Sequence, residues 1–533
     1  MALRIHKTKR AIVGAGVVAL AGFASQYAAA DGREIIRDRC LACHTESGDA
    51  DTPSFSRISS QRKTPEGWLM TINRMIELRG LPISADEKRE VVKYLADTQG
   101  LAPSETADYR YLLEQDTNRV ESGLDGDLMQ NCARCHSAAR FALQRRTQDE
   151  WQTLVDFHMA QFPGLELHAG ARDREWYRIV HDQTAVQLSK MFPLETQAWS
   201  NWKEADKSDL MGRWRVTGFM PGKGEFDAWM TAAKNDTDHF SLSLEGRYAD
   251  GEVIAGSGKA TVYTGYEWRG SLTVDGVNLR QVMSVADDGN SMNGRMFLAK
   301  ERRVGGDLQA FRDSGEPMIV AVSPSYLRKG QSAELTIIGE NLDGDIDLGK
   351  GVSVDRVIER SADRIVVAAT AQGDEGARLV SVGEASSEAA LKVYTQLARV
   401  DVTPANAVSR IGGNGSEMDK VRAIYRAVGY SAGADGKAGT EDDLRLGYMP
   451  AQWSIEPADE VAEEEKDHIY AGQITDQGIF IPGDAGPNPE RFMSANNVGR
   501  LTVVAHVQDG EDKVEGEGSM LVSVPDFVQR VLD

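Results

Sequence analysis

Four cysteines stand in two short motifs of identical spacing, and they are the only cysteines of the chain. The motifs are Cys40-Leu41-Ala42-Cys43-His44 and Cys132-Ala133-Arg134-Cys135-His136. Both read Cys-x-x-Cys-His, the attachment sequence of c-type haem. Two thiols on one helical turn can each form a thioether to a porphyrin vinyl group, and the adjacent imidazole can then bind the iron. A thioredoxin-like redox pair or a zinc site would not explain a histidine after the second cysteine in both copies.

The sequence therefore predicts two covalently bound haem c groups. We expect Cys40 and Cys43 to attach the first and Cys132 and Cys135 to attach the second, with His44 and His136 as iron ligands.

A repeat downstream of each motif indicates where the opposite iron ligands lie. Thr64-Pro65-Glu66-Gly67-Trp68 follows the first motif, and Thr147-Gln148-Asp149-Glu150-Trp151 follows the second. Each is typical of a helix start, with a threonine cap and acidic residues in the first turn. Met75 and His158 occupy the same position relative to these tryptophans, about two helical turns beyond them. We predict Met75 as the second ligand of the first iron and His158 as that of the second.

Other donors compete with this assignment. His44 is the only histidine between Asp31 and Asn131, so Met70 and Met129 are the alternatives to Met75. His168 and His181 are the alternatives to His158. A further helix is predicted to close each lobe, over residues 85–98 and 172–191.

The N-terminus has the pattern of a secretory signal peptide. Four basic residues precede an apolar run over residues 11–24, and three alanines end at Ala30 just before Asp31. About 14 apolar residues are too few to span a bilayer, so cleavage after Ala30 and export to the periplasm are expected. The removed segment holds four basic and no acidic residues, which changes the net charge from -21 to -25.

Length and charge limit the remaining possibilities. A chain of 533 residues is long enough for several domains. Its 81 acidic residues against 60 basic ones argue against nucleic-acid binding, and no membrane span is expected after signal removal.

From about Trp199 onward, glycines and alternating apolar residues replace helical periodicity. Strands of an antiparallel barrel or sandwich are predicted over residues 212–219, 239–248, 260–263, 266–274 and 291–299. The predicted fold is an all-α dihaem cytochrome c domain followed by three all-β barrel or sandwich domains. The predicted boundaries are a signal peptide (1–30), a dihaem domain (31–198, lobes 31–115 and 116–198), an antiparallel barrel (199–312), an immunoglobulin-like sandwich (313–396) and a C-terminal sandwich (397–533). No phosphate loop or hydrolase motif occurs in the β part, so no catalytic residue is assigned to this chain. The acidic loop 435–443 is left open as a calcium site.

This arrangement resembles the alpha subunit of quinohemoprotein amine dehydrogenase. The resemblance rests on the two haem motifs, on residues 149–164 and on Val322-Ser323-Pro324-Ser325-Tyr326, and it extends over the mature sequence. It implies a periplasmic heterotrimer with a beta propeller subunit and a small gamma subunit. In that family the gamma subunit carries a cysteine tryptophylquinone, which oxidises a primary amine to an aldehyde and ammonia.

The resemblance thus implies an electron-transfer subunit that passes electrons to an external copper protein or cytochrome c. A methionine ligand raises the potential of a haem relative to two imidazoles, so we expect electrons to flow toward the His44/Met75 site. Two other functions remain as alternatives: a freestanding dihaem electron carrier and a dihaem peroxidase.

Overall fold

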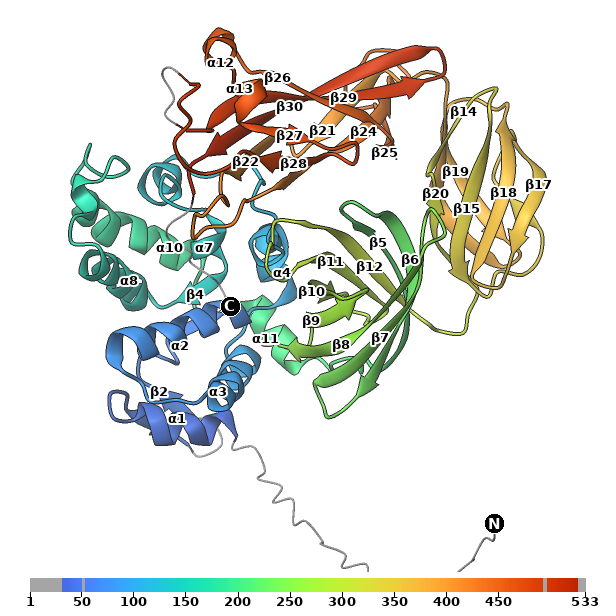
Figure 1. Cartoon of the computed structure of the whole chain (residues 1–533). Helices are drawn as coiled ribbons and strands as arrows, with labels where there is room; N and C mark the ends of the chain where they lie inside the picture. The colour runs from blue at the N-terminus through green and yellow to red at the C-terminus, as the bar shows by residue number, and fades with distance from the viewer. Residues whose placement is uncertain (1–30, 50–52, 492–495, 526–533) are drawn as a thin grey trace, which may run out of the picture.

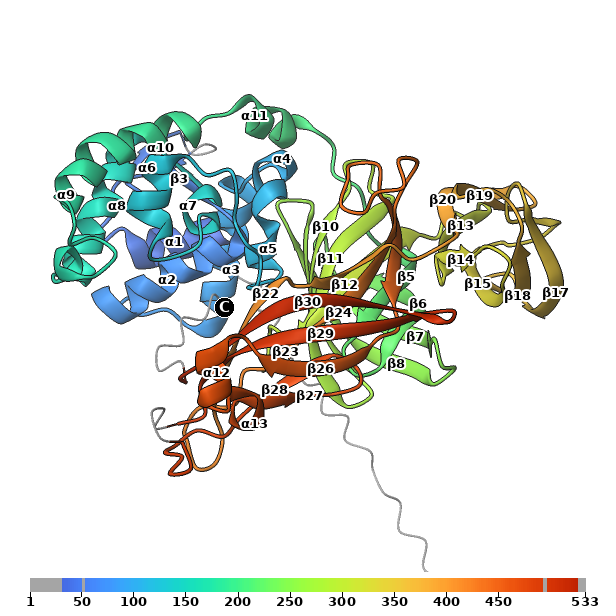
Figure 2. The same cartoon turned by 90° about the horizontal axis from the view of Figure 1, so that it is seen from above.

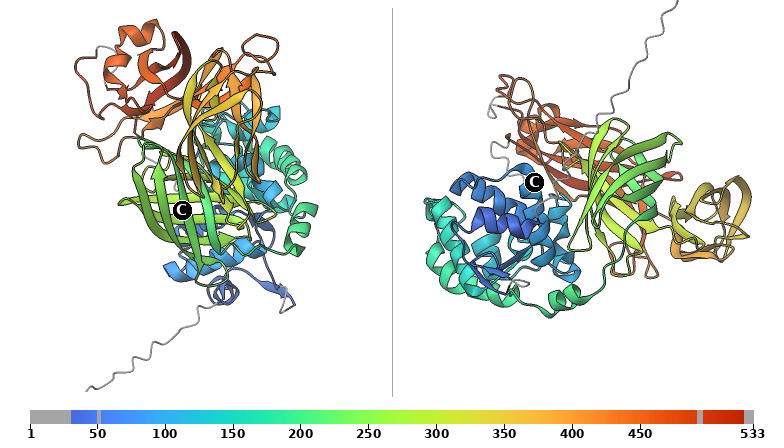
Figure 3. Two further views of the ribbon diagram at one scale, coloured as in Figure 1. Left: turned by 90° about the vertical axis from the view of Figure 1, so that its right-hand side faces the viewer. Right: turned by 90° about the horizontal axis from the view of Figure 1, so that it is seen from below.

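The computed structural model describes residues 31–49, 53–491 and 496–525. The predicted signal peptide, residues 1–30, lies outside these ranges. A helical region lies on one side of a β barrel, and a two-sheet unit lies on the opposite side (Figure 1, Figure 2). The C-terminal unit lies across the barrel and toward the helical region, and the two views in Figure 3 show the same arrangement.

The first lobe of the helical region is built around helix α2, which begins where the sequence predicts. The hydroxyl of Thr64 accepts a hydrogen bond from Gly67 N, and the helix ends at Gly80, whose φ of 67° is left-handed. Trp68 and Ile72 on α2 pack with Ile36 and Leu95 in one apolar core. The elements are α1 (Gly32–Cys40), β1 (Glu46–Gly48), β2 (Pro53–Phe55), β3 (Gln61–Lys63), α2 (Pro65–Arg79), α3 (Ala85–Thr98), α4 (Pro103–Thr106) and α5 (Arg110–Leu113).

The second lobe repeats this plan around α8. Thr147 caps α8 by accepting a hydrogen bond from Glu150 N, and Trp151 is buried in the core of the lobe. The helix expected over 172–191 begins only at Trp176 and contains a π-helical turn, Val180–Thr184. The elements are α6 (Gly126–Leu128), a π-helical turn (Met129–Ala133), α7 (Ala139–Ala142), β4 (Gln144–Arg146), α8 (Gln148–Gln161), α9 (Trp176–Ile179), α10 (Ala185–Met191) and α11 (Gln197–Glu204).

Eight antiparallel strands close into a barrel next to the helical region. Its interior is filled by large apolar side chains such as Trp214, Phe240 and Trp268, so it is a packed core. The strands are β5 (Gly212–Met220), β6 (Gly224–Lys234), β7 (His239–Tyr248), β8 (Val253–Tyr263), β9 (Glu267–Val274), β10 (Val277–Val285), β11 (Ser291–Leu298) and β12 (Gly305–Arg312).

Two four-stranded sheets form the next unit, with a core that includes Leu335, Ile365 and Val393. One sheet has the order β13-β15-β18-β17 and the other β14-β20-β19-β16. The strands are β13 (Met318–Ser323), β14 (Tyr326–Arg328), β15 (Ser332–Glu340), β16 (Ile346–Asp347), β17 (Val352–Arg360), β18 (Arg364–Ala371), β19 (Gly376–Val382) and β20 (Ala385–Tyr394).

The C-terminal unit has three sheets and two short helices. The sheets are ordered β21-β24-β25, β22-β30-β29-β26 and β23-β28-β27. The elements are β21 (Arg399–Thr403), β22 (Asn406–Arg410), β23 (Ala423–Ile424), β24 (Arg426–Ser431), β25 (Leu444–Met449), β26 (Gln452–Pro457), α12 (Glu460–Glu464), α13 (Asp467–Tyr470), β27 (Gly472–Ile474), β28 (Ile479–Pro482), β29 (Gly499–Asp509) and β30 (Asp512–Ser523).

The predicted fold class, an all-α domain followed by three all-β barrel or sandwich domains, is wrong. Strands make up 42% of the structure and helices 23%, and the two kinds of element are not separated as expected. The helical region contains β1–β4, and the C-terminal unit has three sheets plus α12 and α13. The strands in the helical region are three residues long, too short to show alternation. Helix α12 lies in an acidic run and is capped by Asp459, which accepts a hydrogen bond from Ala462 N.

Candidate functional site

Each cysteine pair lies on a single turn at the end of a helical segment. In the first motif, Cys43 N and His44 N both donate to Cys40 O, at 3.1 and 3.0 Å, so the turn continues from α1. In the second, Cys135 N donates to Cys132 O at 3.3 Å, directly after the π-helical turn. All four thiols are free of disulfides. This is the placement that two thioether bonds to one porphyrin require.

The histidine of each motif directs one ring nitrogen to a backbone carbonyl. His44 Nδ1 donates to Ser56 O at 2.7 Å, and His136 Nδ1 donates to Ser137 O at 2.9 Å. Because Nδ1 carries the proton, Nε2 retains the lone pair that binds a metal. Both imidazoles are therefore in the tautomer that suits an iron ligand.

A cavity of about 440 Å³ in the second lobe brings together the residues predicted for the second haem. Cys132, Cys135, His136 and His158 all line it. His158 Nδ1 donates to Leu154 O at 2.7 Å, which again leaves Nε2 for a metal. The remaining wall is largely apolar and includes Leu112, Leu113, Phe141, Leu143, Trp151, Leu154, Val155, Phe157, Phe162, Leu165, Trp176, Val180 and Leu188.

Burial sets the protonation of these groups. It lowers the pKa of His136 and of His158 below the usual range, which favours the neutral imidazoles that coordinate iron. It also raises the pKa of the Cys132 thiol to about 12. The donor set, the tautomers and the cavity fit a c-type haem.

The competing histidines are less well placed. His168 also lines the cavity, but its Nδ1 accepts a hydrogen bond from Gly170 N at 3.1 Å. In a neutral ring the proton then lies on Nε2, where it blocks coordination. His181 is not among the residues that line this cavity; its Nδ1 contacts Asp182 at 2.8 Å and its ring stacks on Tyr177. His158 thus stays the predicted ligand.

In the first lobe the structure separates the candidate methionines. Met75 lies half-buried near the C-terminal end of α2. Met70 lines the cavity of the second lobe, and Met129 is exposed in the π-helical turn beside the second motif. The pairing of Met75 with His44 on one iron stays a prediction.

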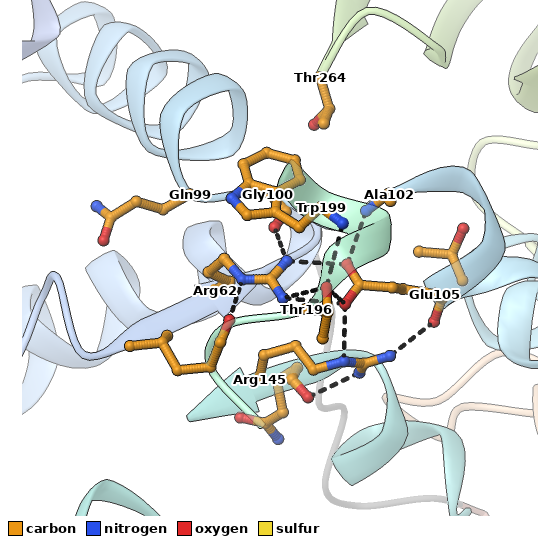
Figure 4. A network of polar contacts seen from close by, with 12 residues as sticks. Arg62, Gln99, Gly100, Ala102, Glu105, Arg145, Thr196, Trp199 and Thr264 are labelled. Atoms are coloured by element: carbon orange, nitrogen blue, oxygen red, sulfur yellow. Dashed lines mark hydrogen bonds and ion pairs between the residues drawn. The ribbon is translucent and has the colours of Figure 1, made fainter. Parts of the chain in front are cut away.

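The two lobes are joined by a ribbon formed by β3 and β4, in which Gln61 pairs with Arg146, Arg62 with Arg145 and Lys63 with Gln144. On one face, Arg62 and Arg145 both bind Glu105, with shortest distances of 2.8 and 3.1 Å (Figure 4). Arg62 also stacks on Trp199 at 5.0 Å. All three charged side chains are buried, so this network is a buried polar connection between the lobes.

The other face of the ribbon turns toward the cavity, because successive side chains of a strand alternate. Lys63, Gln144 and Arg146 line the cavity there. The other basic residues in the wall are Arg74, Arg134 and Arg140. Glu66 is the acidic residue of the wall, and Arg269 of the barrel already pairs with it at 2.6 Å. Arg134 is paired in turn with Asp173 at 2.8 Å. The cavity therefore combines apolar walls with two buried cations on the ribbon, Lys63 and Arg146.

The sequence analysis missed these basic residues. The signal was present: Gln61-Arg62-Lys63-Thr64 and Gln144-Arg145-Arg146-Thr147 extend the same repeat upstream of the helix caps.

The acidic loop considered for calcium uses its carboxylates internally. Asp442 accepts hydrogen bonds from Ala434 N and Asp435 N, and Asp443 pairs with Arg399 at 3.0 Å. Within the described ranges, no group of three or more histidine, cysteine, aspartate or glutamate side chains could hold a metal ion. The loop gives no support for a calcium site.

Family profiles cover nearly all of the chain. Residues 30–199 match the haem-binding region of the quinohemoprotein amine dehydrogenase alpha subunit. Residues 207–313, 316–395 and 400–532 match domains II, III and IV of the same subunit. The chain belongs to the family of quinohemoprotein amine dehydrogenase alpha subunits. Family membership makes it a subunit of an oxidoreductase with a haem-binding region, and it implies that other subunits exist.

Other comparisons add little to this family assignment. A search of curated proteins finds no match. A redesigned β barrel bound to DFHBI is 20% identical over 19% of this chain and 94% of its own, with a TM-score of 0.17. Protocadherin Gamma B2 extracellular cadherin domains 1-5 are 12% identical over 61% of this chain and 73% of their own, also with a TM-score of 0.17. Similarity this low carries no functional argument.

No helix in the described ranges is long and apolar enough to cross a membrane.

Proposed function

We propose that the chain is the electron-transfer subunit of a periplasmic amine dehydrogenase and carries two covalently bound haem c groups. Two observations support this function: the family membership, and the four cysteines of the two motifs, which form no disulfide and are at least partly accessible. The single observation that carries it is the second-lobe cavity, where a thiol pair and two histidines with free Nε2 atoms meet. Bound haem would supply a one-electron carrier at that position.

The chain's own residues hold and insulate the cofactors. Cys40 and Cys43 would attach the first haem, and Cys132 and Cys135 the second. His44 with Met75, and His136 with His158, would bind the two irons. The apolar wall of the second cavity excludes water, which favours electron transfer over chemistry with solvent. No residue of this chain is assigned to amine oxidation.

The remaining parts of the pathway lie outside this chain. Electrons would come from a cysteine tryptophylquinone in a gamma subunit, which assembles with a beta propeller subunit. They would leave to a periplasmic copper protein or cytochrome c. The predicted Met75 ligand would give the first-lobe site the higher potential, so electrons are expected to reach it last.

A peroxidase would need an open iron position with acid-base groups beside it. His158 lies in the cavity wall where it would close that position, so this alternative is disfavoured.

Purification from the native host tests the proposal. The chain is expected to copurify with a propeller subunit and a quinone-bearing subunit, with an intact mass that includes two haems. Addition of a primary amine should then reduce haem in this chain without an added mediator. A chain that purifies alone would favour the freestanding electron carrier, and a mass without two macrocycles would exclude both.

A further inference from the structure

Lys63 is a buried cation without an ion-pair partner among the described residues. Its side chain is 5% exposed and lines the second-lobe cavity, although Lys63 belongs to the first lobe. Its Nζ donates to Thr71 Oγ1 at 2.6 Å and lies 5.0 Å from the centre of the Trp68 ring. A hydroxyl and an aromatic face compensate an ammonium only in part, so burial there is costly.

Arg146 is its counterpart from the second lobe. It stands at the equivalent position of the repeat, and its guanidinium lies 5.7 Å from the centre of the Trp151 ring, whereas Lys63 Nζ lies 5.0 Å from that of Trp68. It is 6% exposed, and its nearest carboxylate is that of Glu150, at 3.6 Å. Arg57 binds the same carboxylate more closely, at 2.8 Å. One shared carboxylate therefore serves two arginines and leaves the Lys63–Arg146 pair with excess positive charge.

The pKa values of Lys63 and Arg146 reflect this excess of positive charge. Burial, followed by the charges of Arg146 and Arg74, lowers the pKa of Lys63 well below its ordinary value. Burial lowers the pKa of Arg146 to about 10. An anion placed between these two side chains would reverse both effects.

The haem proposed for the cavity would supply such an anion. A haem carries two propionate carboxylates on the edge of an otherwise apolar ring, and this cavity offers an apolar wall with cations grouped on the ribbon. We propose that Lys63 and Arg146 bind the propionates of the second haem and raise its reduction potential. This inference rests on the proposed function, because it requires haem in the cavity. It also means that the second haem site is completed by a side chain of the first lobe.

Potentiometric titration of the holo-complex tests this role. The variants are Lys63→Met, which removes the charge at similar length, and Lys63→Arg, which keeps it. Loss of a cation beside the propionates should shift the reduction equilibrium of the second haem about tenfold toward the oxidised form, which is about 59 mV for a one-electron couple. The first haem should change much less, and Lys63→Arg should keep both potentials.

Lys88→Met is the matched control. Lys88 is a half-buried lysine of the first lobe whose Nζ donates to the uncharged side chain of Asn73 at 3.1 Å, and it does not line the cavity. Its replacement should leave both potentials unchanged. The second haem is assigned by comparison with the double variant Cys132→Ser, Cys135→Ser, which should keep only the first.

The outcomes separate this inference from the proposed function. Fewer than two haems on the unaltered chain would contradict the proposed function itself. Two haems with no potential shift in Lys63→Met, or with equal shifts of both haems, would overturn the role of Lys63 and leave the function standing. Selective loss of the second haem in Lys63→Met, with retention in Lys63→Arg, supports the role. If Lys63→Met does not fold, the same titration is made on Arg146→Gln, which should likewise lower the potential of the second haem and leave that of the first unchanged.

Discussion

Arg62 and Arg145 lie directly opposite each other in the ribbon between the lobes, and both bind the carboxylate of Glu105. They occupy the same position in the repeat, since each is followed by a basic residue and a capping threonine. The two strands of the ribbon are therefore related by a local, approximate two-fold axis that passes near this pair. Two guanidinium groups that bind the same carboxylate would repel each other if that carboxylate were removed.

Replacement of Glu105 by Gln should strongly destabilise the helical region. The change leaves two buried cations without their common partner, and breaking a buried ion pair in this way costs about 3–5 kcal/mol. The unfolding transition followed by haem absorbance would report it. Glu252→Gln removes one member of an exposed pair with Lys223 and should change the stability far less, because water and salt screen an exposed pair. Equal losses in the two variants would contradict the special role of Glu105.

Acid should loosen the contacts of the helical region, because Glu105 and Glu267 are held ionised. Burial opposes ionisation of Glu105, but the hydrogen bond from Arg62 and the charges of Arg145 and Arg62 outweigh it and lower its pKa. Burial likewise opposes ionisation of Glu267, and Arg110 and Arg269 again lower the pKa.

A lowered folded-state pKa gives stability that is present above the unfolded value and lost as pH falls through the folded value. The ordinary value for a glutamate is about 4.5. We therefore expect the unfolding free energy of the helical region to decrease as the pH falls below about 4.5. Glu105→Gln should show a shallower loss over that range than the unaltered chain, and parallel pH profiles would refute this explanation.

Met75→Ala should lower the higher of the two haem potentials, or abolish that haem's low-spin spectrum, because it removes the predicted thioether ligand. Redox titration of each haem provides the measurement. Met70→Ala is the matched control, since Met70 is on the same helix but lines the second-lobe cavity. An unshifted upper potential in Met75→Ala would rule out both the ligand assignment and the predicted direction of electron flow.

His158→Ala should open the second iron to external ligands. Carbon monoxide should then bind one haem of the reduced complex, and cyanide one haem of the oxidised complex, whereas His168→Ala and His181→Ala should stay unreactive because neither imidazole is predicted to coordinate. Optical titration with each ligand would distinguish the three variants. Ligand binding in His168→Ala rather than His158→Ala would transfer the assignment to His168.

Strongly periodic segments and motifs could be predicted from sequence. The segments 85–98 and 239–248 coincide with α3 and β7, and both threonine caps form as expected. Other strands were only partly predicted. The segment 260–263 covers the end of β8, which begins at Val253. Gly256 and Gly258 interrupt the alternation in its first half because the backbone of β9 lies too close for a side chain at Gly258.

The cavity wall shows a different limit of sequence reasoning. Cysteine and histidine ligands are recognised by type and spacing, but Lys63 reaches the cavity only because β3 pairs with a strand from the other lobe. Pairing between three-residue strands leaves no periodic signal. The repeated tetrapeptide could have revealed equivalent positions, but not the antiparallel register that turns Arg62 and Lys63 to opposite sides.

The ribbon formed by β3 and β4 should not tolerate a change in the length of either strand, because successive side chains of a strand point to opposite sides. Deleting or inserting one residue within β3 would exchange the two sides at once, so that Arg62 would face the cavity and Lys63 would face Glu105. Point substitutions of either cation alter one environment, whereas such a frame slip would disturb cofactor retention and lobe cohesion together. Engineered variants of this protein should therefore accept substitutions in the tripeptide 61–63 far more readily than a change in its length.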